Sequence, residues 1–152
     1  MLGFLKRHKK FFTEAEKKGI IEAIHLAEHR TSGEIRVYVE SRCSYMDAID
    51  RAAEIFLKLD MQKTMDRNAV LIYVAIKDKQ LAIFGDEGIH TKVGDEYWQK
   101  EIQKMISHFN KEDFADGIRQ CVLDVGEALQ THFPYNKDTD KNELPDDIVF
   151  GR

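Results

Sequence analysis

Acidic side chains gather in two short stretches of this 152-residue chain, and they are the residues best placed to do chemistry. Asp60 and Asp66 precede a strongly apolar run, whereas Asp86, Glu87 and Asp95 follow the next apolar run. Carboxylate oxygens that are not accompanied by thiolate or imidazole ligands favour calcium or magnesium over zinc. The residue types therefore predict a site for one or two divalent cations, Ca²⁺ or Mg²⁺.

Two apolar runs lie between these acidic stretches and predict adjacent strands. Residues 69–76 are almost wholly apolar, which is typical of a strand covered on both faces. Residues 77–80 are polar and few enough to reverse the chain, so residues 80–85 should pair antiparallel with the first run. The alternation of polar and apolar residues at 34–40 predicts a further strand, near an edge of the sheet.

Helical spacing of apolar residues accounts for most of the remaining chain. Thr13 followed by Glu16 has the pattern of a capping box, which marks the start of a helix. Helices are expected at about 13–29, 44–60, 95–109 and 111–132. These elements predict an α/β fold, namely an αβα sandwich with a small mixed central sheet and helices on both faces.

The order of these elements predicts which loops meet. A strand, helix, strand sequence gives parallel strands by default, so both strands begin at the same end of the sheet. An antiparallel third strand must finish at that end, which brings together the loops at 31–34, 60–68 and 85–95. Like charges can crowd there if cations or positive side chains neutralise them. We expect a cation to bridge the second and third loops, with Asp66 and Asp86 as its leading ligands.

Two other interpretations of the acidic residues stay open. Carboxylates in loops are mostly solvated or cap helices, as Asp95 would do for the helix that follows it. Residues 138–142 repeat the first ligand positions of an EF-hand loop. However, Glu143 stands where that loop needs glycine and Val149 where it needs a bidentate glutamate, so a solvated tail is favoured.

Composition bounds the organisation of the chain and its partners. With 43% hydrophobic and 33% charged residues, it has the balance of one globular domain. We divide it into a basic N-terminal segment at 1–12, an α/β domain at 13–133 and an irregular acidic tail at 134–152. A net charge of -4 argues against nucleic acid as a partner, because phosphate binding needs a basic face.

Neither a membrane span nor a disulfide is expected. The apolar stretch that precedes the first basic residues covers only Met1 to Leu5, whereas a signal-peptide core needs roughly 7–15 residues and a membrane helix about 20. We therefore expect a cytoplasmic protein without a transmembrane segment. Cys43 and Cys121 lack the spacing of a redox or zinc motif and should be unpaired thiols.

Several motifs together resemble the TPM domain family over nearly the whole chain. They are Thr31-Ser32-Gly33-Glu34-Ile35-Arg36-Val37, Arg67-Asn68, Gly85-Asp86-Glu87-Gly88-Ile89-His90, Trp98 and Asn142-Glu143-Leu144-Pro145-Asp146. Most members carry a signal peptide and a transmembrane helix, so this chain resembles a stand-alone version. The resemblance implies an αβα sandwich whose acidic loops are associated with divalent metal, especially calcium, and a plant member has been described as a phosphatase.

Two functions follow from these observations. The first is a stand-alone TPM domain that binds divalent cations, calcium above all, and serves as a regulatory or interaction module for a protein partner that the sequence does not identify. The alternative is a metal-dependent phosphatase that acts on phosphomonoesters. A metal held by Asp66 and Asp86 could polarise a phosphoryl oxygen, but no nucleophile elbow or glycine-rich phosphate loop accompanies them.

Overall fold

Strand β2 (Ala69–Ala75) is buried at every residue, as its apolar sequence predicts. The structure, a computed structural model, describes residues 11–135 and 148–151, and places β2 inside a four-stranded sheet of order β3-β2-β1-β4. Strand β1 (Glu34–Glu40) runs parallel to β2, whereas β3 (Gln80–Gly85) runs antiparallel to it. The predicted mixed sheet is confirmed.

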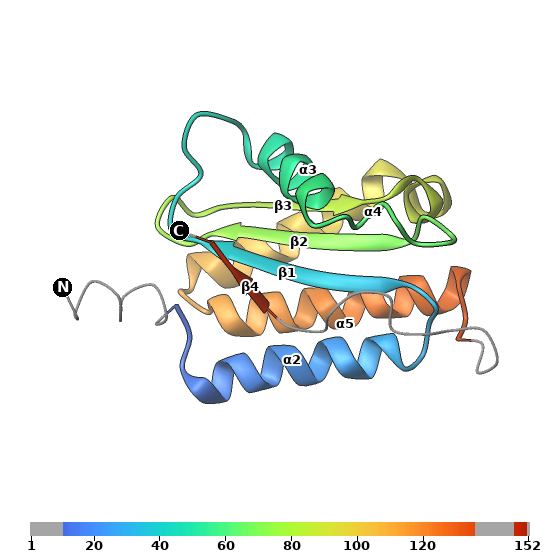
Figure 1. The fold of residues 1–152 in the computed structure, drawn as a ribbon. Coiled ribbons are helices and arrows are strands. Elements are labelled where there is room, and N and C mark those ends of the chain that lie inside the picture. Colours follow the sequence, from blue (N-terminus) through green and yellow to red (C-terminus); the bar gives the residue numbers. More distant parts are fainter. Residues whose placement is uncertain (1–10, 136–147, 152) are drawn as a thin grey trace.

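Both faces of the sheet are covered by helices (Figure 1). Alternate residues of β2, namely Val70, Ile72 and Val74, belong to the core formed with α2 (Glu14–Glu28), α4 (Glu87–Asn110) and α5 (Phe114–His132). The intervening residues Leu71, Tyr73 and Ala75 belong to a second core with α3 (Ala48–Lys58). A strand that packs against two cores needs apolar residues on both faces, which explains its sequence.

Strand β1 is not itself an edge strand, but it lies next to one, in agreement with its predicted position near an edge of the sheet. It lies between β2 and a short strand, β4 (Ile148–Phe150), which was not among the predicted strands. Its alternating polar residues are buried because they have partners in the fold. The carboxylate of Glu40, for example, accepts hydrogen bonds from Arg51 Nε at 2.9 Å and from the Tyr73 hydroxyl.

Helix α2 begins at the capping residue that the sequence predicts. Thr13 Oγ1 accepts a hydrogen bond from the Glu16 amide at 3.1 Å, and Glu16 Oε1 accepts one from the Thr13 amide at 2.8 Å, so the predicted capping box is confirmed.

No helix in the described part of the chain combines the length and apolar character that crossing a membrane requires. Cys43 and Cys121 are free thiols, as predicted.

Part of the sequence-based interpretation falls outside the described residues. This applies to positions 1–10 of the basic N-terminal segment and to the EF-hand-like stretch at 138–142.

Candidate functional site

The predicted convergence of loops at one end of the sheet is confirmed by the strand register. Glu34 at the start of β1 lies opposite Ala69 at the start of β2, and Gly85 at the end of β3 lies opposite Val70. The segments that precede β1 and β2 and the segment that follows β3 therefore meet at this end. We refer to it as the acidic end of the sheet.

The predicted loop at 85–95 is mostly helical, which corrects the sequence analysis. Asp86 is the N-cap of α4, and its carboxylate accepts a hydrogen bond from the Glu87 amide at 2.8 Å. An aspartate in extended conformation just before a helix satisfies an amide that has no partner within the helix. Gly94, with φ of 78°, then breaks α4 close to where the helix was expected to begin.

Arg67 supplies the positive charge at the acidic end. Its Nε and one terminal nitrogen donate hydrogen bonds to the two carboxylate oxygens of Asp86 at 2.7 and 2.8 Å, and the other terminal nitrogen lies 3.7 Å from Glu87 Oε1. Asp86 is only 4% exposed, so this bidentate pair compensates for burial of the carboxylate. The hydrogen bond to Asp86 is also the main cause that raises the pKa of Arg67.

Sequence reasoning did not place Arg67 among the site residues. Two signals were available: Arg67-Asn68 is among the motifs that carry the family resemblance, and crowded carboxylates need a counter-charge. Its backbone has φ of 51°, a left-handed conformation that is uncommon outside glycine. The turn that aims the side chain at Asp86 is therefore an unusual local structure.

The backbone also joins the segment before β2 to the first turn of α4. The Gly88 amide donates a hydrogen bond to the Arg67 carbonyl oxygen at 2.8 Å. A Cβ atom on residue 88 would lie 2.1 Å from the Asp66 carbonyl oxygen, which is far inside van der Waals contact. Only glycine permits this approach, so Gly88 is required by the contact between the two segments that a cation was predicted to bridge.

A pocket of about 520 Å³ lies beside this contact, and three of the predicted ligands line it. They are Asp86, Glu87 and Asp95; Arg67 and His90 add polar groups, and the apolar lining comes from α3, β3 and Trp98. Trp98 Nε1 donates a hydrogen bond to His90 Nδ1 at 3.0 Å, and His90 Nε2 lies 3.5 Å from Asp95 Oδ1. The lining thus combines apolar side chains with three carboxylates, and we refer to this cavity as the acidic pocket.

The other two predicted ligands lie outside the described lining of this pocket. Asp60 is exposed, has φ of 58° and pairs with Lys63 at 3.5 Å. Asp66 is exposed as well, although its carbonyl oxygen contacts the first turn of α4. Within residues 11–135 and 148–151, no three His, Cys, Asp or Glu side chains form a group that could hold a metal ion.

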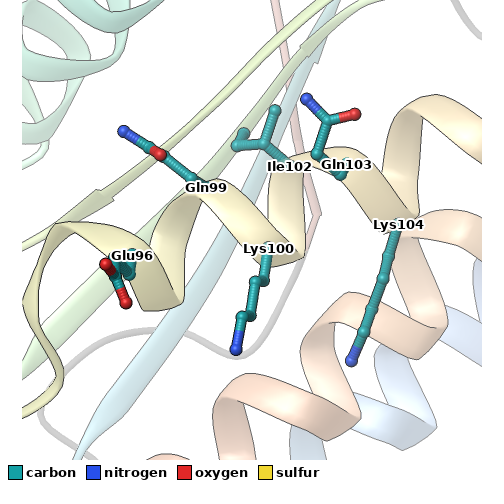
Figure 2. Close-up of a pocket in the computed structure, with 6 residues that line it drawn as sticks. All are labelled: Glu96, Gln99, Lys100, Ile102, Gln103 and Lys104. Carbon is teal, nitrogen blue, oxygen red and sulfur yellow. The ribbon is translucent and has the colours of Figure 1, made fainter.

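A larger pocket of about 640 Å³ lies along the second segment of α4 and shares Gln99 with the acidic pocket. Figure 2 shows its described lining, in which Lys100 and Lys104 extend to one side of the helix while Gln99, Ile102 and Gln103 extend to the other. These side chains come from one helix and do not converge on a common point. The acidic pocket has the more specific arrangement of polar groups.

The comparisons with known proteins agree with this fold. The family profile of the TPM domain matches residues 5–128. The NMR structure of BA42 protein from the psychrophilic bacterium Bizionia argentinensis is similar, with 42% identity, 93% of this chain and 96% of that chain covered, and a TM-score of 0.85. Curated proteins gave no match.

A more distant structure supports the fold alone. The N-terminal domain of cg2496 protein from Corynebacterium glutamicum shares 15% identity, with 79% of this chain and 75% of that chain covered, and a TM-score of 0.60. The family match and the similarity to BA42 carry the assignment: this chain belongs to the TPM domain family.

Proposed function

We propose that this TPM domain binds a divalent cation, calcium or magnesium, at the acidic end of the sheet and acts as a regulatory or interaction module. The observation that carries the proposal is the presence of Asp86, Glu87 and Asp95 in the lining of one pocket. Arg67 places a positive charge between two of them, which supports the proposal because these carboxylates already have a cationic partner in the fold.

Cation binding would require a modest rearrangement of side chains. The side chains of Glu87 and Asp95 are 71% and 83% exposed, so both can rotate toward a shared ion without disturbing the core. Asp66 lies on the segment that contacts the first turn of α4, from which it can supply a further oxygen. The ion would compete with the Arg67 guanidinium for Asp86, and binding would tighten the connection between the two segments.

We favour binding over hydrolysis as the role of this pocket. The described lining contains no serine, threonine or cysteine, so a phosphatase here would need a carboxylate, His90 or a metal-bound water as its nucleophile. The phosphatase alternative therefore rests on the family resemblance, and we make it an outcome of the experiment below.

The test is a calcium titration followed by amide NMR and thermal unfolding. The informative variant is Glu87→Gln with Asp95→Asn, because both side chains are exposed and neither anchors the fold. Asp86 is less suitable, since it caps α4 and pairs with Arg67. A matched control is Glu96→Gln with Asp116→Asn, two exposed carboxylates outside the described lining of the acidic pocket.

In the unaltered protein and the control we expect saturable shifts in residues 60–68 and 86–95. We also expect a gain in stability of roughly 2.7 kcal/mol at a hundredfold excess of calcium over its dissociation constant. The informative variant should lose most of both effects. Shifts confined to residues 138–147 would refute this site. Metal-dependent turnover of p-nitrophenyl phosphate that the variant abolishes would favour the phosphatase instead.

A further inference from the structure

Strand β3 is the last strand in the sheet order, so one of its edges has no strand beside it among the described residues. The direction of its backbone groups follows from one hydrogen bond. The Asp86 amide donates to the Ala69 carbonyl oxygen at 2.9 Å, and this pair continues the register beyond Val70 and Gly85, the last pair of the antiparallel ladder. Bonded and non-bonded pairs alternate in such a ladder. The residues of β3 whose amide and carbonyl groups face inward, toward β2, are therefore Gln80, Ala82 and Phe84.

The remaining residues, Leu81, Ile83 and Gly85, direct their amide and carbonyl groups to the outer edge. The acidic pocket lies along this edge. Ile83 and Phe84 line the pocket together with Ile49 of α3 and Trp98 of α4. Because α3 and Trp98 belong to the cores on opposite faces of the sheet, the pocket reaches both sides of this terminal strand.

The charge of this groove selects the partner. Three carboxylates against one guanidinium make the lining acidic at the Gly85 end, whereas Ile49 and Trp98 offer apolar contact on either side of the strand. An extended peptide that carries basic side chains between apolar ones matches both properties. Backbone hydrogen bonds to the unpaired outer edge of β3 would supply affinity, and the alternate side chains would supply specificity.

We infer that the outer edge of β3 binds an extended, basic segment of a partner protein, which adds to the sheet as a further strand with a basic side chain beside Glu87 and Asp95. This inference deepens the interaction role proposed above and rests on it, but it does not require the cation. The experiment is therefore performed in EDTA, so that failure of calcium binding and failure of peptide binding are separate results.

The probe is the capped hexapeptide Lys-Val-Lys-Val-Lys-Val, and its counterpart with glutamate in place of lysine is the charge control. Titration of the labelled protein should shift the amide signals of Leu81, Ile83 and Gly85 and slow their exchange with solvent. The inward-facing amides of Gln80, Ala82 and Phe84 are already bonded to β2 and should change little in exchange. The glutamate peptide should bind about tenfold more weakly or not at all.

Two variants test the backbone and the charge separately. Leu81→Pro removes an outward amide but leaves the ladder to β2 intact, and Leu81→Ala is its matched control because it shortens the side chain and keeps the amide. Glu87→Gln with Asp95→Asn should weaken binding of the lysine peptide by about tenfold, whereas Glu96→Gln should not. The charge variant keeps the test valid if the proline variant does not fold.

Three results would overturn the inference. The first is equal binding of the two peptides, and the second is a set of saturable shifts away from β3 or no saturable shift at all. The third is a change of the Leu81, Ile83 and Gly85 amide signals when the protein concentration is raised in the absence of peptide. A second copy of the chain would then occupy the edge.

Discussion

The indole of Trp98 lies directly against the backbone of Gly85, at a separation that leaves no room for a side chain. A Cβ atom on residue 85 would stand 2.4 Å from Cζ2 of the indole ring. The same indole donates its hydrogen bond to His90 on the first segment of α4. One side chain thus connects the end of β3 with both segments of the kinked helix, and the acidic pocket lies among these three elements.

Gly85→Ala should destabilise the protein by about 1–3 kcal/mol, because the indole must move out of a packed position. Urea unfolding measures this change. Gly19→Ala is the control, since a Cβ atom there would meet only Arg119 Cδ at 3.7 Å, an ordinary contact. Replacing a glycine inside α2 should stabilise the protein by roughly 0.5–1 kcal/mol. Equal stability of the two variants would contradict the close contact at Gly85.

Gly88→Ala should cost more stability than Gly85→Ala. The added methyl group would stand 2.1 Å from the Asp66 carbonyl oxygen and 2.5 Å from that of Arg67, and backbone atoms cannot move aside as an indole can. We expect the first turn of α4 to separate from residues 66–67 and the hydrogen bond from the Gly88 amide to break. Amide hydrogen exchange measures this change, and we expect faster exchange only in residues 60–68 and 86–93. A variant with unchanged exchange there would refute the steric argument.

Glu101 should make the protein less stable as the pH rises. Its side chain is almost wholly buried between α4 and α5, where Lys104 Nζ lies 3.2 Å from Glu101 Oε2 and 3.2 Å from Asp124 Oδ2. Burial, followed by the neighbouring Asp124 carboxyl, raises the pKa of Glu101 to about 7. The folded state binds the proton of the Glu101 carboxyl more tightly than the unfolded state does. The contribution of this proton to the free energy of unfolding is therefore complete below about pH 4.5 and is lost as the pH rises to about 7.

The variant Glu101→Gln should therefore show a flatter dependence of unfolding free energy on pH between 5 and 8. Relative to the unaltered protein it should gain roughly 1–3 kcal/mol across that range. Denaturant unfolding at several pH values checks this, and Glu96→Gln on the exposed face of the same helix is the control. An unchanged slope in the Glu101 variant would mean that the carboxyl ionises normally.

Arg67→Gln should bind calcium more tightly than the unaltered protein, although it folds less stably. Glutamine keeps hydrogen-bond donors near Asp86 and removes the positive charge that competes with the metal. Isothermal titration calorimetry should show a several-fold lower dissociation constant. A weaker affinity would mean that Arg67 helps to organise the cation site, and the competition described above would be wrong.

The strands were predictable because their signals are local. The apolar run of β2 and the alternation of β1 fix both elements to within about one residue. The burial of polar residues in β1 was not predictable, since a residue such as Glu40 depends on partners outside the strand such as Arg51. Strand β4 has only three residues, too few for a periodic pattern.

The candidate site was predictable in its location and only partly in its chemistry. Chain order and the default parallel crossover were enough to bring the acidic segments to one end of the sheet. Residues 85–95 were predicted to form a loop, whereas Gly88 lies inside α4, where its backbone makes a close contact with residues 66–67. The pairing of Arg67 with Asp86 joins residues 19 positions apart, and no local pattern reveals it.

The pairing of β4 with β1 has a consequence for the order in which the fold is completed during synthesis. Val37 lies opposite Ile148, and the Gly151 amide donates a hydrogen bond to the Val39 carbonyl oxygen, so β1 gains its second neighbour only when residues about 110 positions later leave the ribosome. Until then β1 is a nascent edge that can pair with other chains. Ribosomes that stall before Ile148 would release chains whose central strand is still open to such pairing.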